Sequence, residues 1–494
     1  MGFQTECPTM QKTKTIRKIL IANRGEIVLR VIRTIKELGL VTVVAYEKPD
    51  RDAYFIRYAE EAIEIGEGPI SDYLDIEKMI RAARETGADA IHPGYGFLSE
   101  NADFAEACEK AGIIFIGPPS WVLRYLSNKA AVRHMVQHSG VPTIPGTELL
   151  SPGEKGLMEA MRFGKNYEYP LMIKATAGGG GRGVRRVQSE LDLMKHLIYI
   201  RSQSRPLWDE GVFVEKCMDS VRHVEIPILA DQHGNIIHLG SLDGSIQRRH
   251  QKLVEIAPAN LPPNLLDSLY WASVRAARAV GYVNAGSLEF LVRPETGEFW
   301  FMTFNRRLTV EHPATEELTN VDIVREQIRI AEGHRLQIPQ ERIKLSGKAI
   351  QVRINAEDPL RDFRPEGEKT VELYLPPGGP GIRLDGIVFQ GYRIPAEYDP
   401  LLVKLTVRGY DWEQATSRLR KALDSFVLVG PQTTIPFYRS VCIETDFREE
   451  RMDTHYIQKH PQIFQYPSVA DEAAKLESFF MEQYTAEFLP ANWL

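Results

Sequence analysis

The first pattern that could do chemistry is a run of glycines in the first half of the chain. The run contains Gly178, Gly179, Gly180, Gly181 and Gly183 around Arg182. It lies between two apolar segments, residues 170–175 and 184–187, that predict strands. Glycine lets backbone N–H groups approach an anion closely and accepts positive φ. The run is neither a Walker loop nor a dinucleotide fingerprint, so alone it indicates either a phosphate-binding loop or a flexible turn.

Lysines near the run favour the phosphate interpretation. Lys174 ends the apolar segment before the glycines, which places its ammonium at the base of the loop. Lys129 lies earlier, at the centre of a predicted helix, and Glu215 and Lys216 lie at the end of the next predicted strand, residues 212–215. A single lysine is usually a solvated surface residue. Together with the glycines, these residues predict a clamp for the phosphates and the base of a nucleotide.

A predicted β-hairpin carries candidate metal ligands. Its strands are residues 286–293 and 298–305. Alternate residues of a strand share a face, so Thr303 and Asn305 lie together, with Glu289 roughly opposite. A carboxylate and an amide oxygen suit Mg²⁺, which keeps several waters and bridges nucleotide phosphates. A lone Glu on a strand is more often a surface residue. The hairpin is therefore a candidate metal site only in combination with the residues around it.

Two further polar clusters follow the same logic. One is the segment 247–252, with the sequence Gln-Arg-Arg-His-Gln-Lys, and the other gathers Arg307, Thr309, Glu311 and His312. Both are dense in groups that could hold an anion or move a proton. Charge runs of this kind are usually solvated faces, so each cluster is a weak signal by itself.

The elements that must position these residues fall into distinct patterns. Apolar runs at 18–22, 41–46, 88–91 and 113–116 alternate with helical patterns at 25–38, 76–86 and 102–110. This order predicts a parallel sheet with helices on both faces. The later chain shows antiparallel signals, including a hairpin at 224–240, and a helix at 412–425. We therefore expect a mixed α/β and α+β protein.

Taken in order, the clusters resemble the biotin carboxylase family of ATP-grasp enzymes over residues 14–465. The matching stretches are IANRGEIVLR (21–30), IHPGYGFLSEN (91–101), FIGP (115–118), KATAGGGGR (174–182), RHVEI (222–226), QRRHQK (247–252), VEHP (310–313) and RINAEDP (353–359). One such match would be weak, but this many in one order are specific.

The resemblance implies a domain organisation. A Rossmann-like preATP-grasp domain would occupy residues 14–117, and linker helices residues 118–144. A mobile glycine-rich lid would occupy 145–217, the ATP-grasp C-terminal and biotin carboxylase C-terminal parts 218–465, and a tail 466–494.

It also implies a reaction in which ATP and bicarbonate form carboxyphosphate, whose CO₂ is attacked by a ureido nitrogen of biotin. The residues that would hold ATP are Lys129, Lys174, Gly179, Gly180, Gly181, Arg182, Gly183, Glu215, Lys216, Met218, His223, Glu225, Gln247 and His250. Those that would hold bicarbonate and biotin are Lys252, Arg307, Thr309, Val310, Tyr95 and Arg353. Lys252, Arg307, Glu311 and Arg353 would be catalytic, with Glu311 as the base that deprotonates bicarbonate and Arg353 stabilising the biotin enolate.

Three positions depart from the family pattern. Mg²⁺ or Mn²⁺ would bind Glu289 and Asn305, but Thr303 stands where the family has a second metal-binding Glu. A neutral hydroxyl is a weaker ligand than a carboxylate. Thr309 replaces a Gln that contacts bicarbonate, and Arg306 replaces a residue that is commonly Thr.

These departures leave three functions open. The first is the biotin carboxylase subunit of an acyl-CoA or pyruvate carboxylase. Because no Ala-Met-Lys-Met-type motif is present, its biotin would sit on a separate carrier protein, with a carboxyltransferase as a further partner and a homodimer as the assembly. The second is an ATP-grasp ligase with a different acid or acceptor. The third is a nucleotide-binding scaffold without turnover, against which the retained Glu311, Lys252 and Arg353 speak.

Composition sets outer limits. The formal net charge is −6 over 494 residues, which gives no reason to expect nucleic acid or an anionic membrane as a partner. The four cysteines lie far apart without metal-type spacing, which favours free thiols in a reducing compartment. The N-terminus is polar and lacks the apolar centre of a secretory signal. We therefore expect a cytoplasmic protein.

Overall fold

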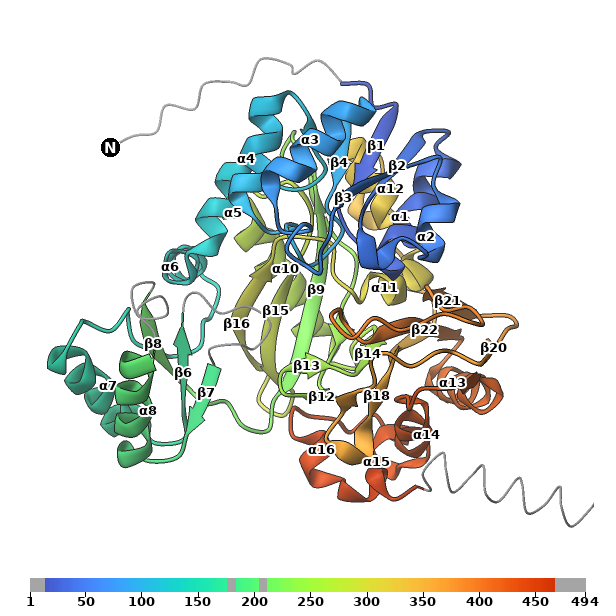
Figure 1. Cartoon of the computed structure of the whole chain (residues 1–494). Coiled ribbons are helices and arrows are strands. Elements are labelled where there is room, and N and C mark those ends of the chain that lie inside the picture. The colour runs from blue at the N-terminus through green and yellow to red at the C-terminus, as the bar shows by residue number, and fades with distance from the viewer. Residues whose placement is uncertain (1–13, 176–183, 204–210, 467–494) are drawn as a thin grey trace, which may run out of the picture.

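The computed structural model describes residues 14–175, 184–203 and 211–466 (Figure 1). The predicted phosphate loop, with Gly179, Gly180, Gly181, Arg182 and Gly183, lies outside these residues, as does nearly all of the predicted tail. Within the described ranges no helix is both long and apolar enough to cross a bilayer.

A parallel sheet of five strands forms the N-terminal part, in the order β3-β2-β1-β4-β5. Its strands are β1 (Lys18–Ile21), β2 (Val41–Glu47), β3 (Glu61–Gly66), β4 (Ala90–His92) and β5 (Ile114–Phe115), and its main helices are α1 (Glu26–Glu37), α3 (Ile76–Thr86) and α4 (Ala102–Ala111), with the short α2 (Tyr54–Tyr58). Ile19 and Ile21 pack with α1 in one apolar core, whereas Leu20 packs with α3 and α4 in another. The period of two thus buries both faces of the strand, which confirms the predicted parallel sheet covered on both sides.

Two helices follow where the sequence predicted one. The prediction of a helix with Lys129 at its centre is wrong. The helix α5 (Ser120–Ser127) ends before Asn128, and Lys129 is the first residue of α6 (Lys129–His138). Asn128 is extended, with φ −85° and ψ 95°, and its side chain accepts a hydrogen bond from the Ala131 N–H at 3.0 Å. Asn is a preferred N-cap, so the break has a local cause, and it places Lys129 at the positive end of α6.

The lid is a small unit with a core of its own. The antiparallel strands β6 (Leu171–Ala175), β7 (Val184–Val187) and β8 (Val212–Lys216) are covered by α7 (Glu154–Tyr167) and α8 (Glu190–Gln203). The helix α7 has no counterpart among the predicted elements. The buried side chains of this unit form a separate apolar cluster, and in Figure 1 the unit stands away from the main body.

Two chain segments connect the lid to the main body. In the first, the Phe301 N–H donates to Pro142 O at 2.8 Å, and the Thr147 N–H donates to Val214 O at 2.8 Å. This segment therefore pairs with an edge strand of the main sheet and with an edge strand of the lid. The second connection is the chain between β8 and β9, residues 217–221.

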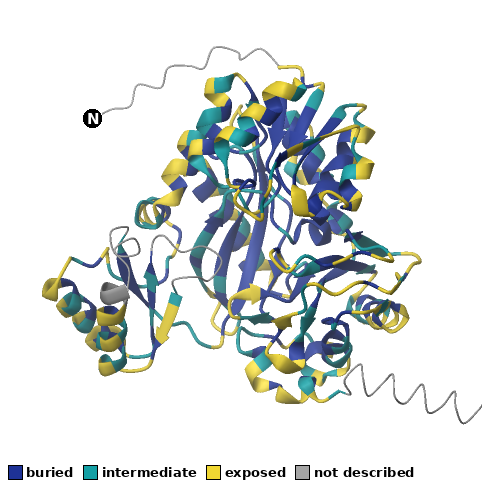
Figure 2. Cartoon of the chain, in the orientation of Figure 1, coloured by how far each residue is buried: buried dark blue, intermediate teal, exposed yellow. Residues whose placement is uncertain are grey.

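The main body is built on a nine-stranded antiparallel sheet. Its order is β16 (Glu298–Asn305), β15 (Asn284–Arg293), β9 (Arg222–Ala230), β11 (Leu242–Asp243), β14 (Val254–Ala257), β17 (Lys348–Asn355), β22 (Leu401–Gly409) and β21 (Ile382–Gly386), with β10 (Ile236–His238) beside β9. The predicted hairpins β9–β10 and β15–β16 are confirmed. Because β14 pairs with β17, one sheet runs without interruption from β16 to β21, and its central strands, such as β9 and β14, are buried (Figure 2).

Helices and short hairpins complete the main body. The helices are α10 (Pro263–Ala279), α11 (His312–Thr319), α12 (Ile323–Ala331), α13 (Trp412–Ser425), α14 (Ile435–Ile443), α15 (Thr445–Arg448) and α16 (Tyr456–Lys459). The short strands are β12 (Gln247–Arg248), β13 (Gln251–Lys252), β18 (Glu357–Asp358), β19 (Arg364–Pro365), β20 (Leu373–Leu375) and β23 (Val427–Val429). The helix predicted at 412–425 is confirmed.

A buried arginine of the N-terminal part contacts the C-terminal half through a tyrosine ring. The Arg24 guanidinium donates to both carboxylate oxygens of Asp50, at 2.7 and 2.9 Å. It also lies 3.8 Å from the ring centroid of Tyr398, whose hydroxyl donates to Glu47 at 2.6 Å. A cation stacked on a ring and held by two oxygens is a rigid contact, so the two halves are fixed relative to each other around the site.

We predict that Asn128→Ala weakens both stability and nucleotide binding. Loss of the N-cap should cost about 1 kcal/mol of unfolding free energy and loosen the helix start that carries Lys129. Urea unfolding and ATP titration would measure the two effects. Asp411→Ala removes a cap of the same kind from α13 and should lower stability alone. Equal ATP affinities in the two variants would contradict the positioning role of Asn128.

Candidate active site

A cavity of about 1220 Å³ lies between the lid, the N-terminal sheet and the main sheet. Among the residues that line it are Lys129, Lys174, His223, Glu289, Glu311 and Arg353. It thus gathers residues that are more than 200 positions apart in the chain. Every predicted site residue in the described ranges lines it except Glu225 and Tyr95, which lie just behind its wall.

The lid side of the cavity carries the predicted phosphate lysines. Lys129 Nζ donates to Ala175 O at 3.2 Å, at the end of the strand that leads into the glycine run. Lys174 Nζ lies 2.5 Å from Glu215 Oε2. Burial lowers the pKa of Lys129, and the nearby Lys174 lowers it further. Two ammonium groups held this close attract a polyanion such as a nucleotide phosphate chain.

The side chain of Lys216, unlike those of Lys129 and Lys174, is bound to the end of a helix. Its ammonium donates to Tyr167 O at 2.5 Å and to Glu168 O at 3.2 Å, the carbonyls at the C-terminal end of α7. Helix C-termini leave carbonyls without intrahelical partners, and a lysine satisfies them. The Lys216 side chain therefore braces the lid.

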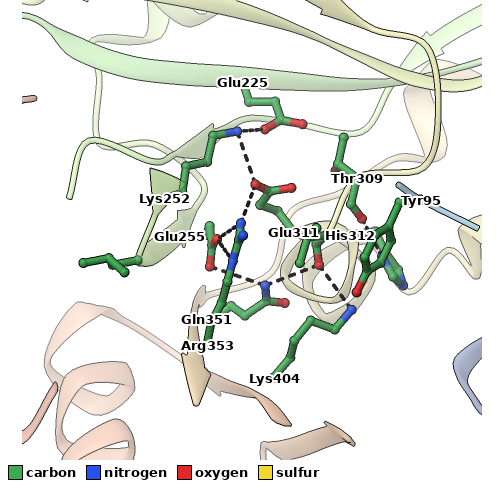
Figure 3. A network of polar contacts seen from close by, with 12 residues as sticks. Tyr95, Glu225, Lys252, Glu255, Thr309, Glu311, His312, Gln351, Arg353 and Lys404 are labelled. Atoms are coloured by element: carbon green, nitrogen blue, oxygen red, sulfur yellow. Dashed lines mark hydrogen bonds and ion pairs between the residues drawn. The ribbon is translucent and has the colours of Figure 1, made fainter. Parts of the chain in front are cut away.

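Lys252 is the centre of the main-sheet side. Its ammonium, 8% exposed, binds Glu225, lies 2.8 Å from Glu289 Oε1 and lies 3.3 Å from Glu311 Oε1 (Figure 3). Burial opposes the charged form, but the three carboxylates outweigh it and raise the pKa of Lys252 well above its usual range. The ammonium is a permanent positive charge beside the cavity.

The predicted metal ligands lie together. Glu289 and Thr303 are direct partners across the β15–β16 ladder, and Asn305 pairs with Ser287 on the same ladder. The Asn305 amide nitrogen donates to Glu289 Oε1 at 3.0 Å. Burial would raise the pKa of Glu289, but Lys252 and His223 lower it well below its usual value, so the carboxylate is ionised. One ionised carboxylate with an amide and a hydroxyl fits a single Mg²⁺ that takes its other ligands from phosphates and water.

Glu311 lies deep in the cavity between two cations. Its Oε1 accepts from Arg353 Nη2 at 2.8 Å and lies 3.3 Å from Lys252 Nζ. Burial raises the pKa of Glu311, but Lys252 and then Arg353 lower it to about 2. The group is therefore ionised and able to accept a proton, although both cations weaken it as a base.

Arg306 and Arg307 follow β16 on the wall next to Glu100. The Arg306 backbone N–H donates to Glu100 Oε1 at 3.1 Å, and its Nη1 donates to Leu123 O at 2.7 Å. Arg307 Nη1 donates to Leu308 O at 3.1 Å. The Arg306 side chain thus ties the loop after β16 to α5 on the wall of the cavity.

The sequence patterns did not reveal four buried polar residues of this region. Glu255, Gln351 and Lys404 are 0% exposed, and Glu26 is 3% exposed. Lys404 Nζ lies 3.0 Å from Glu26 Oε1 and donates to Val310 O at 3.3 Å, and the Tyr95 hydroxyl donates to Glu26. A usable signal existed, because Glu255 and Lys404 each interrupt an otherwise apolar strand. Charges at such positions are buried and paired.

Comparison with known proteins agrees with this geometry. Three family models match in order: "Biotin carboxylase, N-terminal domain" at residues 15–123, "Carbamoyl-phosphate synthase L chain, ATP binding domain" at 128–339 and "Biotin carboxylase C-terminal domain" at 351–459. The fold and the site therefore define an ATP-grasp enzyme, an ATP-dependent ligase. The chain belongs to the biotin carboxylase family, whose members carboxylate biotin with ATP, Mg²⁺ and bicarbonate.

Individual relatives are similar over nearly their whole length. A pyruvate carboxylase subunit of Methanothermobacter thermautotrophicus is 42% identical, over 96% of this chain and 96% of its own. Biotin carboxylase of Nostoc is 45% identical, over 90% of this chain and 98% of its own. The solved biotin carboxylase domain of Hydrogenobacter thermophilus 2-oxoglutarate carboxylase, a dimer in complex with MgADP, ADP and bicarbonate, has a TM-score of 0.88 at 43% identity and covers 92% of this chain and 100% of its own.

We predict that Glu311→Gln abolishes bicarbonate-dependent ATP hydrolysis. Removing a general base typically costs 10²- to 10⁴-fold in rate, whereas the ATP affinity should change less than about twofold, because Glu311 lies beside Lys252 and Arg353 and not beside the lid lysines. ADP release and ATP titration would measure both quantities. Glu341→Gln, at an exposed position, is the control and should match the unmodified protein. Bicarbonate-dependent hydrolysis that survives in Glu311→Gln would remove Glu311 from its role as the base.

Proposed function

We propose that this protein is the biotin carboxylase subunit of a multi-subunit acyl-CoA or pyruvate carboxylase. The observation that carries the proposal is the ionised Glu311 held between Lys252 and Arg353 in the same cavity as the lid lysines. This arrangement offers a base, two fixed positive charges and a polyphosphate site within one enclosed space.

The residues then take defined roles in the reaction. Lys252, Arg307 and the backbone of Val310 hold bicarbonate, and Glu311 accepts its proton. The bicarbonate oxygen attacks the γ-phosphorus of ATP, ADP leaves, and the carboxyphosphate breaks down to CO₂ and phosphate. The phosphate takes the ureido proton of biotin, the biotin nitrogen attacks CO₂, and Arg353 stabilises the enolate that forms between these steps.

The nucleotide would lie between the lid and the main sheet. Lys129, Lys174 and the glycine run neutralise and cover its phosphates. The residues that would lie next to the adenine and the remainder of the nucleotide are Glu215, Lys216, Met218, His223, Gln247 and His250. Glu225, predicted with them, lies behind the cavity wall and would act through Lys252. When bound, a Mg²⁺ on Glu289, with oxygens of Asn305 and Thr303, supplies further neutralisation of the phosphate charge.

Partners follow from the same proposal. Two relatives of matching length are named as subunits, one of a pyruvate carboxylase and the other, the small one, of a 2-oxoglutarate carboxylase. We infer a separate biotinylated carrier, a separate carboxyltransferase that selects the final acceptor, and a homodimer like the one in the solved 2-oxoglutarate carboxylase domain. The unpaired Cys108, Cys217 and Cys442 accord with the reducing cytoplasm.

A second candidate is an ATP-grasp ligase with another acid or acceptor. Thr303 and Thr309 both line the cavity and are shorter than the Glu and Gln that the family usually has there. Two shortened side chains leave room that a larger acid than bicarbonate would fill.

One assay separates these functions. ADP release is measured with Mg²⁺ or Mn²⁺, with and without bicarbonate and free biotin. We expect turnover that requires bicarbonate and rises with biotin. Turnover that needs neither but responds to another carboxylate or amine would overturn the proposal in favour of the second candidate. ATP binding without turnover would instead indicate a scaffold protein.

We predict that Thr303→Glu strengthens metal binding. The new carboxylate would face Glu289 across the ladder, and a second carboxylate should raise Mg²⁺ affinity in the presence of ADP on the order of tenfold. Calorimetric titration with Mg²⁺ measures it. Thr296→Glu, at the exposed turn of the same hairpin, adds an equal charge away from the site and should leave the affinity unchanged. Unaltered affinity in Thr303→Glu would refute the assignment of this strand pair as the metal site.

A further inference from the structure

Two carboxylates share the guanidinium of Arg353. Nε and Nη2 donate to Glu255 Oε1 at 2.8 and 2.5 Å, and Nη2 also donates to Glu311 Oε1 at 2.8 Å. Figure 3 shows the guanidinium lying between the two acids. No hydrogen bond within the described part of the chain uses Nη1, and Arg353 lines the cavity. The guanidinium is thus held by the carboxylates through Nε and Nη2, and its Nη1 is left for a ligand in the cavity.

The position of Glu255 is set by strand pairing. Glu255 lies opposite Gln351 in the β14–β17 ladder, and Gln351 Nε2 donates to Glu255 Oε2 at 3.3 Å. Arg353 is two residues beyond Gln351, so its side chain projects from the same face of β17. Glu255 is 0% exposed. A buried carboxylate needs a charged partner, and Arg353 is the only cation that forms an ion pair with it among the described residues.

The other titratable groups around Glu255 do not change their ionisation state near neutral pH. Glu311 from the loop before α11 has its pKa lowered to about 2, and Lys252 from β13 has a raised pKa. Arg353 from β17 stays charged, and burial raises the pKa of Tyr438 from α14. Burial raises the pKa of Glu255 itself to about 7, although Arg353 opposes the shift.

A competition between the two acids follows. When Glu255 is ionised, it balances the charge of Arg353, and Glu311 feels less of that charge. When Glu255 is neutral, the guanidinium acts on Glu311 alone and lowers its affinity for a proton. Glu255 therefore determines how strong a base Glu311 is without touching the substrate.

We propose that Glu255 is a positioning residue of the carboxylation reaction: its buried carboxylate fixes Arg353 with Nη1 open to the biotin site and prevents the guanidinium from neutralising the base Glu311. The inference rests on the proposed function. It adds to that function a residue that acts, through Arg353, on two steps of the reaction: the deprotonation of bicarbonate and the stabilisation of the biotin enolate.

The test is the pH dependence of Glu255→Gln, which keeps the shape but not the charge. The carboxyl is neutral below pH about 7 and ionised above it, so in the unmodified protein kcat/KM for bicarbonate should rise through that pH. Bicarbonate concentrations are corrected for the equilibrium with CO₂. In Glu255→Gln the rise near pH 7 should disappear, with kcat lower by on the order of 10²-fold and KM for ATP changed less than about twofold.

Two further variants complete the design. Glu255→Asp retains the charge and should restore the rise with pH and part of kcat. Glu326→Gln, a buried carboxyl on α12 that is 5% exposed and lies outside the cavity lining, is the matched control and should behave as the unmodified protein. A rise near pH 7 that persists in Glu255→Gln, or one that is lost equally in Glu326→Gln, overturns the proposal. If Glu255→Gln does not fold, Glu255→Asp, which keeps the carboxylate, is compared with Glu255→Ala, which removes it. Identical pH profiles of these two variants, in shape and height, would also overturn the proposal.

A second readout does not depend on the reaction. A double-mutant cycle of unfolding free energies for Glu255→Gln and Arg353→Gln should give a coupling that is larger at about pH 8.5 than at about pH 6, because Glu255 is charged only at the higher pH. The absence of bicarbonate-dependent turnover in the unmodified protein would refute the proposed function alone. A coupling near zero at the higher pH would refute the role of Glu255 alone.

Discussion

The ammonium of Lys252 among buried carboxylates is the interaction on which the site depends. Lys252 and Arg353 are two cations facing four acids, Glu225, Glu255, Glu289 and Glu311. Two charges cannot balance four, so the acids divide. Glu289 and Glu311, which line the cavity, have lowered pKa values, whereas burial raises the pKa of the other two, which lie behind it. The two carboxylates that stay ionised are therefore the two that line the cavity, where substrate and metal would bind.

The continuous antiparallel sheet is what brings these groups together. Glu289 pairs with Glu225 across β15 and β9, and Glu255 pairs with Gln351 across β14 and β17. Successive residues of a strand face opposite sides, so a slip of one residue in any ladder would turn an acid away from Lys252. The apolar residues between these acids, such as Leu288 and Ile256, are buried in the cores and fix the register. Packing of ordinary apolar side chains thus sets the electrostatics of the site.

Local patterns could be predicted from the sequence, and distant pairings could not. The β15–β16 hairpin itself follows from alternation and a turn of four residues, but Glu289 lies directly opposite Thr303 only because the register shifts at a bulge between Glu289 and Phe290. The partnership of Glu255 with Arg353 joins residues 98 positions apart, and no local spacing encodes it. The break at Asn128 has a local signal, an Asn at a helix start, but the helical pattern on both sides hides it. The family motifs named many of the charged groups that line the cavity, because chemistry restricts those residues, but did not show that the Lys216 ammonium binds the end of α7.

The two connections of the lid constrain how it can move. Its first connection is hydrogen-bonded to both β16 and β8 through isolated bridges, and its second leaves β8 directly for β9. Two chain connections restrict the unit more than a single one would, and any rotation of the unit would take place about the line that joins them. Since the lid keeps its own apolar core, it would swing as one piece, and each swing would return Lys174 along the same arc.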